Sequence, residues 1–365
     1  MRFSRAGAIL LPLVLGGHLN AAPLYQMVDL GTLGGTFAAA SHINDSGTIT
    51  GNSKDASGNE YAFVYANGQM ASLGTDNGLV PLARNINASG QIEGNLSNGD
   101  LFVWSNGTFT DIPLPAGDSH CRGNGFNDSG EITGQITVST GQILAFLYNP
   151  ANGGSFTTIG TMGGKSTDFS YGSSINDSGQ IEGDSINSNG LDHAFIWTNG
   201  SFQDLGTFGG PASSGVKINN QGHASGTSQT PGDASSDLFF YNGTTMIDGG
   251  TLGGDFANAN DMNDNDEIVG SSYLSDNTTE DAFVYLGSKM YDLNNLVPPD
   301  SGWTFTAATG VNNSGDIVAD AVDANGDEHA FLLTPLPEPA SLACIATTAL
   351  FMTRRPAKSR SGRES

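Results

Sequence analysis

One short motif recurs along the whole chain at a nearly constant spacing. The segment SINDSGQIEG at 174–183 has close relatives, and intervals of 43, 40, 49, 43, 44 and 49 residues separate the asparagines that open their NDSG-like turns. These seven anchor asparagines are Asn44, Asn87, Asn127, Asn176, Asn219, Asn263 and Asn312. A regular period of this length is typical of proteins built from stacked supersecondary units. The chain is therefore expected to fold as a repeat array.

Two further motifs accompany each anchor and divide the repeat into strands. About nineteen residues after most anchors comes an aromatic segment such as YAFVY at 61–65 or DAFVY at 281–285. A polar turn and a strand then lead into a glycine cluster such as DLGTLGG at 29–35 or DLGTFGG at 204–210. Together with the residues before and after the NDSG turn, these segments give four short strands per repeat.

Four strands in repeats of about 45 residues predict an all-β, seven-bladed β-propeller. The last repeat ends at HAFLL (329–333) without its fourth strand, while LYQMVDLGTLGG from Leu24 is a fourth strand with no blade before it. Pairing of these two ends would close the ring and remove the exposed strand edges. The anchor strand would then be innermost and the NDSG segment a hairpin turn. An open β-solenoid is the alternative architecture.

The repeats resemble the HAF family of probable extracellular repeats. The family's His-Ala-Phe tripeptide stands literally at 193–195 and 329–331, and the resemblance covers nearly all of residues 24–333. The second and third repeats depart from it, with SLGTDNG from Ser72 and DIPLPAG from Asp111 in place of LGTLGG. The resemblance implies export and repetition, and it assigns no activity.

Both ends of the chain have the layout of targeting signals. Residues 1–21 combine two arginines, an apolar stretch and small residues near Ala21, as in a secretory signal peptide. Residues 335–365 place Pro337, Glu338 and Pro339 before a short apolar stretch and a basic tail, which resembles the PEP-CTERM sorting signal of Gram-negative bacteria. That resemblance implies recognition by an exosortase-type machinery and only transient membrane contact, since the apolar stretch is too short to span a bilayer. The body, 22–334, would reach the cell surface or biofilm matrix.

The charge and the cysteine content of the body limit the classes of partner that it can bind. The chain has 13 basic and 37 acidic residues, and seven of the basic residues lie at the two extreme ends, which leaves the body with a net charge near −30. Such a surface repels nucleic acid and anionic lipid. The chain has two cysteines, and Cys344 lies in the apolar tail, so Cys121 has no evident partner and no cysteine-based metal site is expected.

No cofactor is expected, although calcium is the ion that the sequence would suit best. Oxygen donors concentrate in NDMNDNDEIVG at 260–270 and VDANGDEH at 322–329, but neither segment has the complete spacing of an EF-hand. Solvated turns are the favoured interpretation. The histidines of the HAF strands, His193 and His329, are expected to pack or to bond turns rather than to bind metal.

A binding site is expected in the loops whose length varies most between repeats. They carry four aromatic residues that can stack on sugar rings, namely Phe169, Tyr171, Trp303 and Phe305. The predicted function is a structural, adhesive or exopolysaccharide-binding role, and the alternative is an extracellular carbohydrate-active hydrolase or lyase. The inner strands predict a channel lined by small residues, including Ala39, Ala40, Ser173, Ser174 and Ala259. A converging pair of buried carboxylates there would instead favour the enzyme.

Overall fold

The computed structural model describes residues 25–336, which form an all-β structure. Its 28 strands are accompanied by three 3-10 turns, η1 (Pro150–Asn152), η2 (Pro231–Asp233) and η3 (Leu293–Asn295). In this part of the chain no helix has the length and apolar character needed to cross a membrane. The signal peptide predicted at 1–21 and the sorting motif of Pro337, Glu338 and Pro339 lie outside the described residues.

The strands pair antiparallel in sets of four that follow chain order from the inside of the molecule outward. The complete sets are β2 (Gly34–Ile43), β3 (Ile49–Asp55), β4 (Glu60–Ala66) and β5 (Gln69–Ser72); β6 (Pro81–Ile86), β7 (Ile92–Leu96), β8 (Leu101–Ser105) and β9 (Thr108–Ile112); β10 (Ser119–Phe126), β11 (Ile132–Thr137), β12 (Ile143–Asn149) and β13 (Ser155–Gly160); β14 (Ser170–Ile175), β15 (Ile181–Ile186), β16 (Asp192–Thr198) and β17 (Ser201–Gly206); β18 (Ser213–Ile218), β19 (Ala224–Gln229), β20 (Ser236–Tyr241) and β21 (Met246–Gly250); and β22 (Gly253–Met262), β23 (Ile268–Leu274), β24 (Glu280–Leu286) and β25 (Lys289–Asp292).

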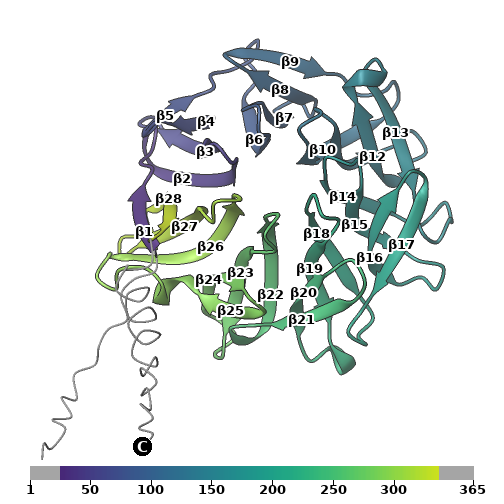
Figure 1. Cartoon of the computed structure of the whole chain (residues 1–365). Coiled ribbons are helices and arrows are strands. Elements are labelled where there is room, and N and C mark those ends of the chain that lie inside the picture. Colours follow the sequence, from purple (N-terminus) through teal and green to yellow (C-terminus); the bar gives the residue numbers. More distant parts are fainter. Residues whose placement is uncertain (1–24, 337–365) are drawn as a thin grey trace, which may run out of the picture.

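The remaining set combines both ends of the described chain. β26 (Trp303–Val311), β27 (Ile317–Asp323) and β28 (Glu328–Pro335) pair in order, and β1 (Tyr25–Asp29) pairs antiparallel with β28 from Tyr25↔Pro335 to Asp29↔Phe331. The sets stand side by side around a central opening, with β1 beside β28 (Figure 1). Single parallel residue pairs connect β2 with β28 and β20 with β22.

A phenylalanine in the third strand of each set forms the core of that set. These residues have at most 1% of their surface exposed and are Phe63, Phe102, Phe146, Phe195, Phe239, Phe283 and Phe331. In the second strand a glycine stands opposite each of the first six of them, as in the pairs Gly51↔Phe63 and Gly226↔Phe239. A Cβ on Gly51 would lie 2.2 Å from Ala39 O and 2.8 Å from the Phe63 ring. The recurring glycine is therefore required chiefly by the close approach of the first strand's backbone, and in four of the six sets also by the phenylalanine ring.

The NDSG segments form the predicted hairpin turns between the first and second strands. In the first repeat, Gly47 N donates to Asn44 O at 2.9 Å, Asn44 N donates to Thr48 O at 3.0 Å, and Gly47 has a φ of +75°. Glycine adopts this left-handed conformation without steric cost, which explains its place at the end of the turn. In the sixth repeat Asp266 occupies this place with a φ of +62°.

Candidate functional site: the central channel

The innermost strand of every set carries a β-bulge at the third residue before the anchor asparagine. In β2, for example, the register with β3 shifts between Ala40 and His42, so Ser41 is the extra residue. Because a bulge re-aims side chains, this position faces the channel in every repeat. The bulged residues all line one cavity of about 530 Å³ and are Ser41, Arg84, Asn124, Ser173, Val216, Asn260 and Thr309.

On the face of the NDSG turns, the anchor asparagines form a continuous belt of hydrogen bonds. Each Nδ2 donates to the backbone oxygen of the next anchor, as in Asn44 to Asn87 at 2.9 Å and Asn176 to Asn219 at 3.0 Å. The corresponding bonds follow through every repeat. Asn312 Nδ2 donates to Asn44 O at 3.3 Å and so joins the last repeat to the first.

A second set of bonds lies at the residue after each anchor. Here a backbone amide donates to a side-chain oxygen of the next repeat, as in Asp128 N to Asp177 Oδ1 at 2.9 Å and Asp177 N to Asn220 Oδ1 at 3.0 Å. The acceptors are Asp128, Asp177, Asn220, Asp264, Asn313 and Asp45. Ala88 interrupts this series, because alanine has no oxygen to offer to the amide of Asp45.

The channel is crossed by a lysine between its two cavities. Lys217 on β18 places Nζ 2.9 Å from Asp261 Oδ1 on β22 and 3.1 Å from His42 Nε2 on β2. Asp261 also accepts the Val311 amide of β26 at 2.9 Å. The side chains of Lys217 and His42 line both the 530 Å³ cavity and a smaller cavity of about 150 Å³ on the NDSG side. This Lys217 bridge therefore lies at the boundary between the two cavities, and we call the larger one the cup.

Two arginines stand in the cup without a carboxylate partner. Arg84 is half-buried on β6, Arg122 is exposed on β10, and within residues 25–336 neither guanidinium forms an ion pair. Arg84 Nε donates to Asn95 Oδ1 at 3.3 Å, which holds its side chain against β7. Burial and the proximity of Arg122 both lower the pKa of Arg84. The two positive charges face the same space and repel one another.

Several carboxyl groups are buried between neighbouring sets. Burial raises the pKa of Glu93, Asp184 and Asp320 to about 7 in each case, and it raises the pKa of Glu182 well above the usual range. None of the four lines either cavity. By contrast, Lys217 and His42 outweigh the effect of burial on Asp261 and hold its pKa far below the usual value. The cup therefore has no converging pair of carboxyl groups with raised pKa values.

The prediction of a channel lined by small residues holds only in part, because Ser41, Ala83 and Ser173 line the cup together with larger basic residues. Ser173 lines the cup as expected, but Ala40 and Ala259 are buried in the cores of their sets. Three of the six basic residues of the body line the cup instead, namely Arg84, Arg122 and Lys217. Sequence reasoning missed them, although a usable signal was present: all three lie within five residues before an anchor asparagine.

The four candidate aromatics are not brought together. Phe169 and Tyr171 are half-buried neighbours with ring centroids 5.1 Å apart at β14, whereas Trp303 belongs to β26 and stacks on His329 at 4.8 Å. Phe305 was predicted to face a ligand, and this is wrong, because the ring has no exposed surface and packs on Phe331. Phe169, Tyr171 and Trp303 keep partly exposed surfaces.

The acidic segments considered for calcium direct their carboxylates to separate partners. Asp261 faces the Lys217 bridge, Asp266 contacts His223 at 2.8 Å, and Glu267 accepts from Asn263 at 2.6 Å. In the second segment, Asp323 Oδ1 accepts the amides of Asn325 and Asp327 in its own turn. Within residues 25–336 no three histidine, cysteine or acidic side chains gather as metal ligands would. Cys121 is buried, and burial raises the pKa of its thiol to about 12.

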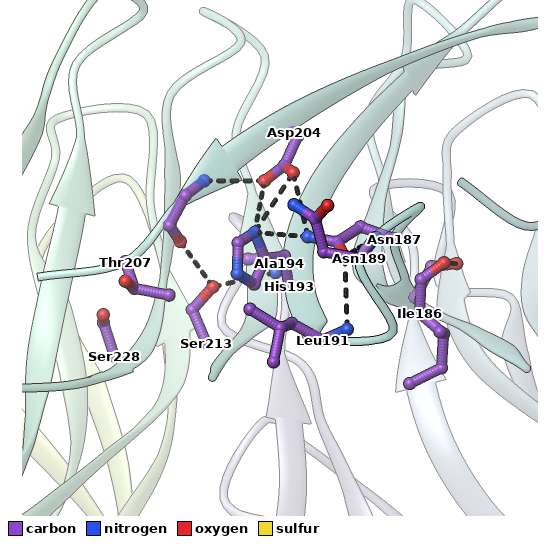
Figure 2. Close-up of polar contacts among 12 residues, drawn as sticks. Ile186, Asn187, Asn189, Leu191, His193, Ala194, Asp204, Thr207, Ser213 and Ser228 are labelled. Atoms are coloured by element: carbon purple, nitrogen blue, oxygen red, sulfur yellow. Dashed lines mark hydrogen bonds and ion pairs between the residues drawn. The ribbon is translucent and has the colours of Figure 1, made fainter. Parts of the chain in front are cut away.

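The histidine of the HAF motif bonds the aspartate of the DLG motif on the neighbouring strand. His193 Nδ1 lies 2.8 Å from Asp204 Oδ1, beside the Ser213 hydroxyl that accepts from Ala194 N and donates to Gly206 O (Figure 2). The same contact recurs at 2.9 Å between His329 and Asp29, which are 300 residues apart. Both histidines thus connect third and fourth strands, as expected for a structural role.

Comparisons with known proteins identify the fold. Neither a protein-family model nor a curated protein sequence matches this chain. Among solved structures, it is similar to the β-propeller domain of the Trilobed protease from Pyrococcus furiosus, which is described as having an open velcro topology, at 9% identity and a TM-score of 0.50 over 83% of this chain and 98% of that one. It is also similar to YCF48 bound to D1 peptide, at 10% identity and a TM-score of 0.49 over 87% and 98% of the two chains.

A third similar structure is TolB from Acinetobacter baumannii, at 11% identity and a TM-score of 0.45 over 79% of this chain and 63% of that one. The chain thus spans less than two thirds of this TolB structure. Likenesses at such low identity show the fold alone. The molecule is an all-β repeat protein whose structural neighbours are β-propellers, as the repeat pattern predicts.

Proposed function

We propose that this chain is an exported, closed seven-bladed β-propeller that binds exopolysaccharide at the cell surface or in the extracellular matrix, as a structural or adhesive protein. The number of anchor asparagines supports seven blades. The pairing of β1 with β28 and the bond from Asn312 to Asn44 support closure by the N-terminal strand. The signal-peptide and PEP-CTERM-like segments support export through an exosortase-type system.

The observation that carries a binding role is the cup itself. A polar cavity of about 530 Å³ has the size of a small-molecule site. Its walls offer hydroxyl, amide and guanidinium groups, which are suited to holding a sugar. The hydrolase alternative would need two carboxylates with separated pKa values beside the substrate. Glu60 is the one carboxylate that lines the cup. Asp261 lines the smaller cavity instead and is held ionised by Lys217.

A glycan array with the purified chain tests the binding role. We expect retention of one or more bacterial exopolysaccharides, with no decrease in chain length of the bound glycan. Tyr171→Ala and Trp303→Ala show whether the outer aromatics contribute, since loss of retention is expected if these rings stack on sugar. Absence of retention on every polysaccharide, or release of shorter saccharides, would contradict the proposed role.

Fractionation of a Gram-negative host tests export separately. The full chain is expected outside the cytoplasm, and deletion of residues 1–21 should retain it inside. Replacement of Pro337, Glu338 and Pro339 by alanine should change only the final surface or matrix location in a host that has the sorting machinery. A full chain that stays in the cytoplasm would overturn the assignment of an exported protein.

A further inference from the structure

The two sides of the cup differ in charge, which favours one direction of approach for an anion. On one side the cup is bounded by the Lys217 bridge, in which the lysine side chain reaches from β18 to His42 on β2. On the other side of this bridge, at the face of the NDSG turns, the channel mouth carries exposed carboxylates at Asp45, Asp128 and Asp177. This acidic mouth repels an approaching anion, whereas Glu60 is the one carboxylate that lines the cup. An anionic ligand would therefore enter from the face opposite the NDSG turns.

The charges that line the cup favour the binding of an anion. The body of the protein is strongly acidic, and yet half of its six basic residues line this cavity. Lys217 is neutralised by Asp261, but Arg84 and Arg122 are not paired. A guanidinium binds a carboxylate through two parallel hydrogen bonds, and two guanidiniums that repel one another gain further when an anion lies between them.

The remaining walls favour a ligand rich in hydroxyl groups. Hydroxyls come from Ser41, Ser173 and Thr309, and amides come from Asn124 and Asn260. Val216 and Leu82 are the larger apolar side chains of the lining, so the cavity has little surface for a lipid or an aromatic ring. The Lys217 bridge narrows the channel beside the cup, which favours the end of a chain or a side branch over a polymer threaded through the ring.

We propose that the cup binds the terminal residue of an acidic saccharide, with the carboxylate of a uronic acid held between Arg84 and Arg122. This inference rests on the proposed polysaccharide-binding function and specifies which sugar, and which end of it, is recognised. Glu93 is buried behind the two arginines, and Asn85 on β6 donates to its Oε2 at 2.9 Å. It takes no direct part in the contact, but its charge opposes theirs.

Calorimetric titration of the full chain with sodium D-glucuronate tests the proposal. D-glucose serves as the neutral analogue, and sulfate serves as an anion without hydroxyl groups. We expect glucuronate to bind more tightly than sulfate, glucose not to bind, and affinity to fall as salt increases. Arg84→Gln and Arg122→Gln should each weaken glucuronate binding about tenfold or more, because a charge-assisted hydrogen-bonded contact is lost. Lys165→Gln is the matched control, since it removes the same charge from an exposed loop.

Equal affinity of the arginine variants and the wild type would overturn the proposal, and so would glucuronate that binds no more tightly than sulfate. Binding to the array distinguishes this failure from a failure of the proposed function. If polysaccharides are retained equally by wild type and by Arg84→Gln, the protein binds glycans elsewhere and the cup inference is wrong. If glucuronate binds in the cup while no polysaccharide is retained, the cup inference stands and the adhesive function is wrong.

Discussion

At the scale of single residues, the anchor asparagine has two functions that its amide group serves at once. In the fourth repeat, Asn176 Oδ1 accepts the amides of Ser178 and Gln180 and thereby shapes its own turn. Its Nδ2 donates to Asn219 O in the following repeat. Aspartate would offer only acceptors at this position, and serine has too short a side chain to do both. Asparagine is therefore retained at all seven anchors for geometry within and between repeats.

Asn176→Ala is expected to lower the free energy of unfolding by about 3 kcal/mol, because buried amides and a carbonyl lose their partners. Urea denaturation followed by circular dichroism measures this loss. Asn152→Ala, which changes an exposed asparagine in η1, is the control and should cost less than about 0.5 kcal/mol. An equal loss of unfolding free energy in both variants would show that the belt of anchor asparagines does not stabilise the protein more than an ordinary surface asparagine does.

Ala88→Asn is expected to stabilise the protein by about 0.5–1 kcal/mol, since it supplies the oxygen that the amide of Asp45 lacks. Asparagine is preferred to aspartate because it completes the series without another negative charge at the acidic mouth. Thermal unfolding should show a higher Tm than in the wild type and than in Ser89→Asn, which places the same residue at the next exposed position. An unchanged Tm in Ala88→Asn would mean that the amide of Asp45 already donates to water and gains nothing from the new side chain.

The sequence predicts the turns but not the bonds between them. Spacing and residue type suffice for Asn44 to Gly47, because turn chemistry is local. The belt of amides depends on where residues 40 or more positions apart come to lie, which follows from ring geometry. The interpretation of Asp177 as a turn residue was correct but incomplete, since Asp177 also accepts the amide of Asp128.

At the scale of elements, the set formed by β26–β28 and β1 is connected differently from the others. β17 follows β16 through a two-residue turn, in which Asn199 and Gly200 have φ of +49° and +89°. β1 has no turn to β28 and is held by its backbone ladder and by the contact of Asp29 with His329. The same histidine–aspartate contact thus fastens a continuous hairpin in one case and two ends of the chain in the other.

Asp29→Ala and Asp204→Ala form a matched pair that separates these two situations. Both variants lose a histidine contact and a glycine amide contact. Hydrogen exchange should accelerate in β1 after Asp29→Ala by clearly more than it does in β17 after Asp204→Ala. The reason is that a strand without a covalent turn opens at a greater gain in entropy. Equal acceleration in both strands would contradict a fastening role for Asp29.

Strand identities were accessible from the sequence because the buried phenylalanines and glycines recur in register. One hairpin departs from the pattern: Asn67-Gly68 and Asn242-Gly243 are the same dipeptide between third and fourth strands, but Asn67 has a φ of +54° and Asn242 lacks positive φ. Its side chain instead accepts the amides of Thr244 and Thr245 in a four-residue connection. The number of residues between paired strands, rather than the Asn-Gly dipeptide, decides the turn type here.

At the scale of the whole molecule, charge is sorted by position. Acidic residues dominate the surface and the mouth of the channel, basic residues gather in the cup, and protonatable carboxyl groups are buried between sets. The sequence shows the overall excess of acidic residues, but it does not show which of them are buried. Glu93 and Glu182 belong to a motif whose turn residues are exposed, so the motif alone does not mark them as buried. Only the packing of one set against the next reveals that they are buried.

Stability is expected to fall as pH rises from 5 to 7.5. Glu93, Asp184 and Asp320 have pKa values raised to about 7, so between about pH 4.5 and 7 the folded state holds protons that the unfolded chain releases. The stabilising effect is complete at low pH and is lost through this window. Asp261, whose pKa is lowered, changes stability only below its usual value.

Urea denaturation at pH 5 and pH 7.5 measures the difference, and Glu93→Gln should reduce it by on the order of 3 kcal/mol. Glu280→Gln, at an exposed position of β24, should leave the difference unchanged. A wild-type protein that is equally stable at both values would contradict the assignment of raised pKa values. In the same range, ionisation of Glu93 should also weaken anion binding in the cup.

The Lys217 bridge limits how this protein can change in evolution. Repeat proteins gain and lose whole units readily, since neighbouring units share the same interface. Here one side chain of fixed length reaches from β18 to β2 and β22 across the opening. An added or deleted unit would alter the width of the opening and separate these ends, leaving the buried Asp261 uncompensated at a cost of about 3–5 kcal/mol. Lys217 thus disfavours any change in the number of repeats.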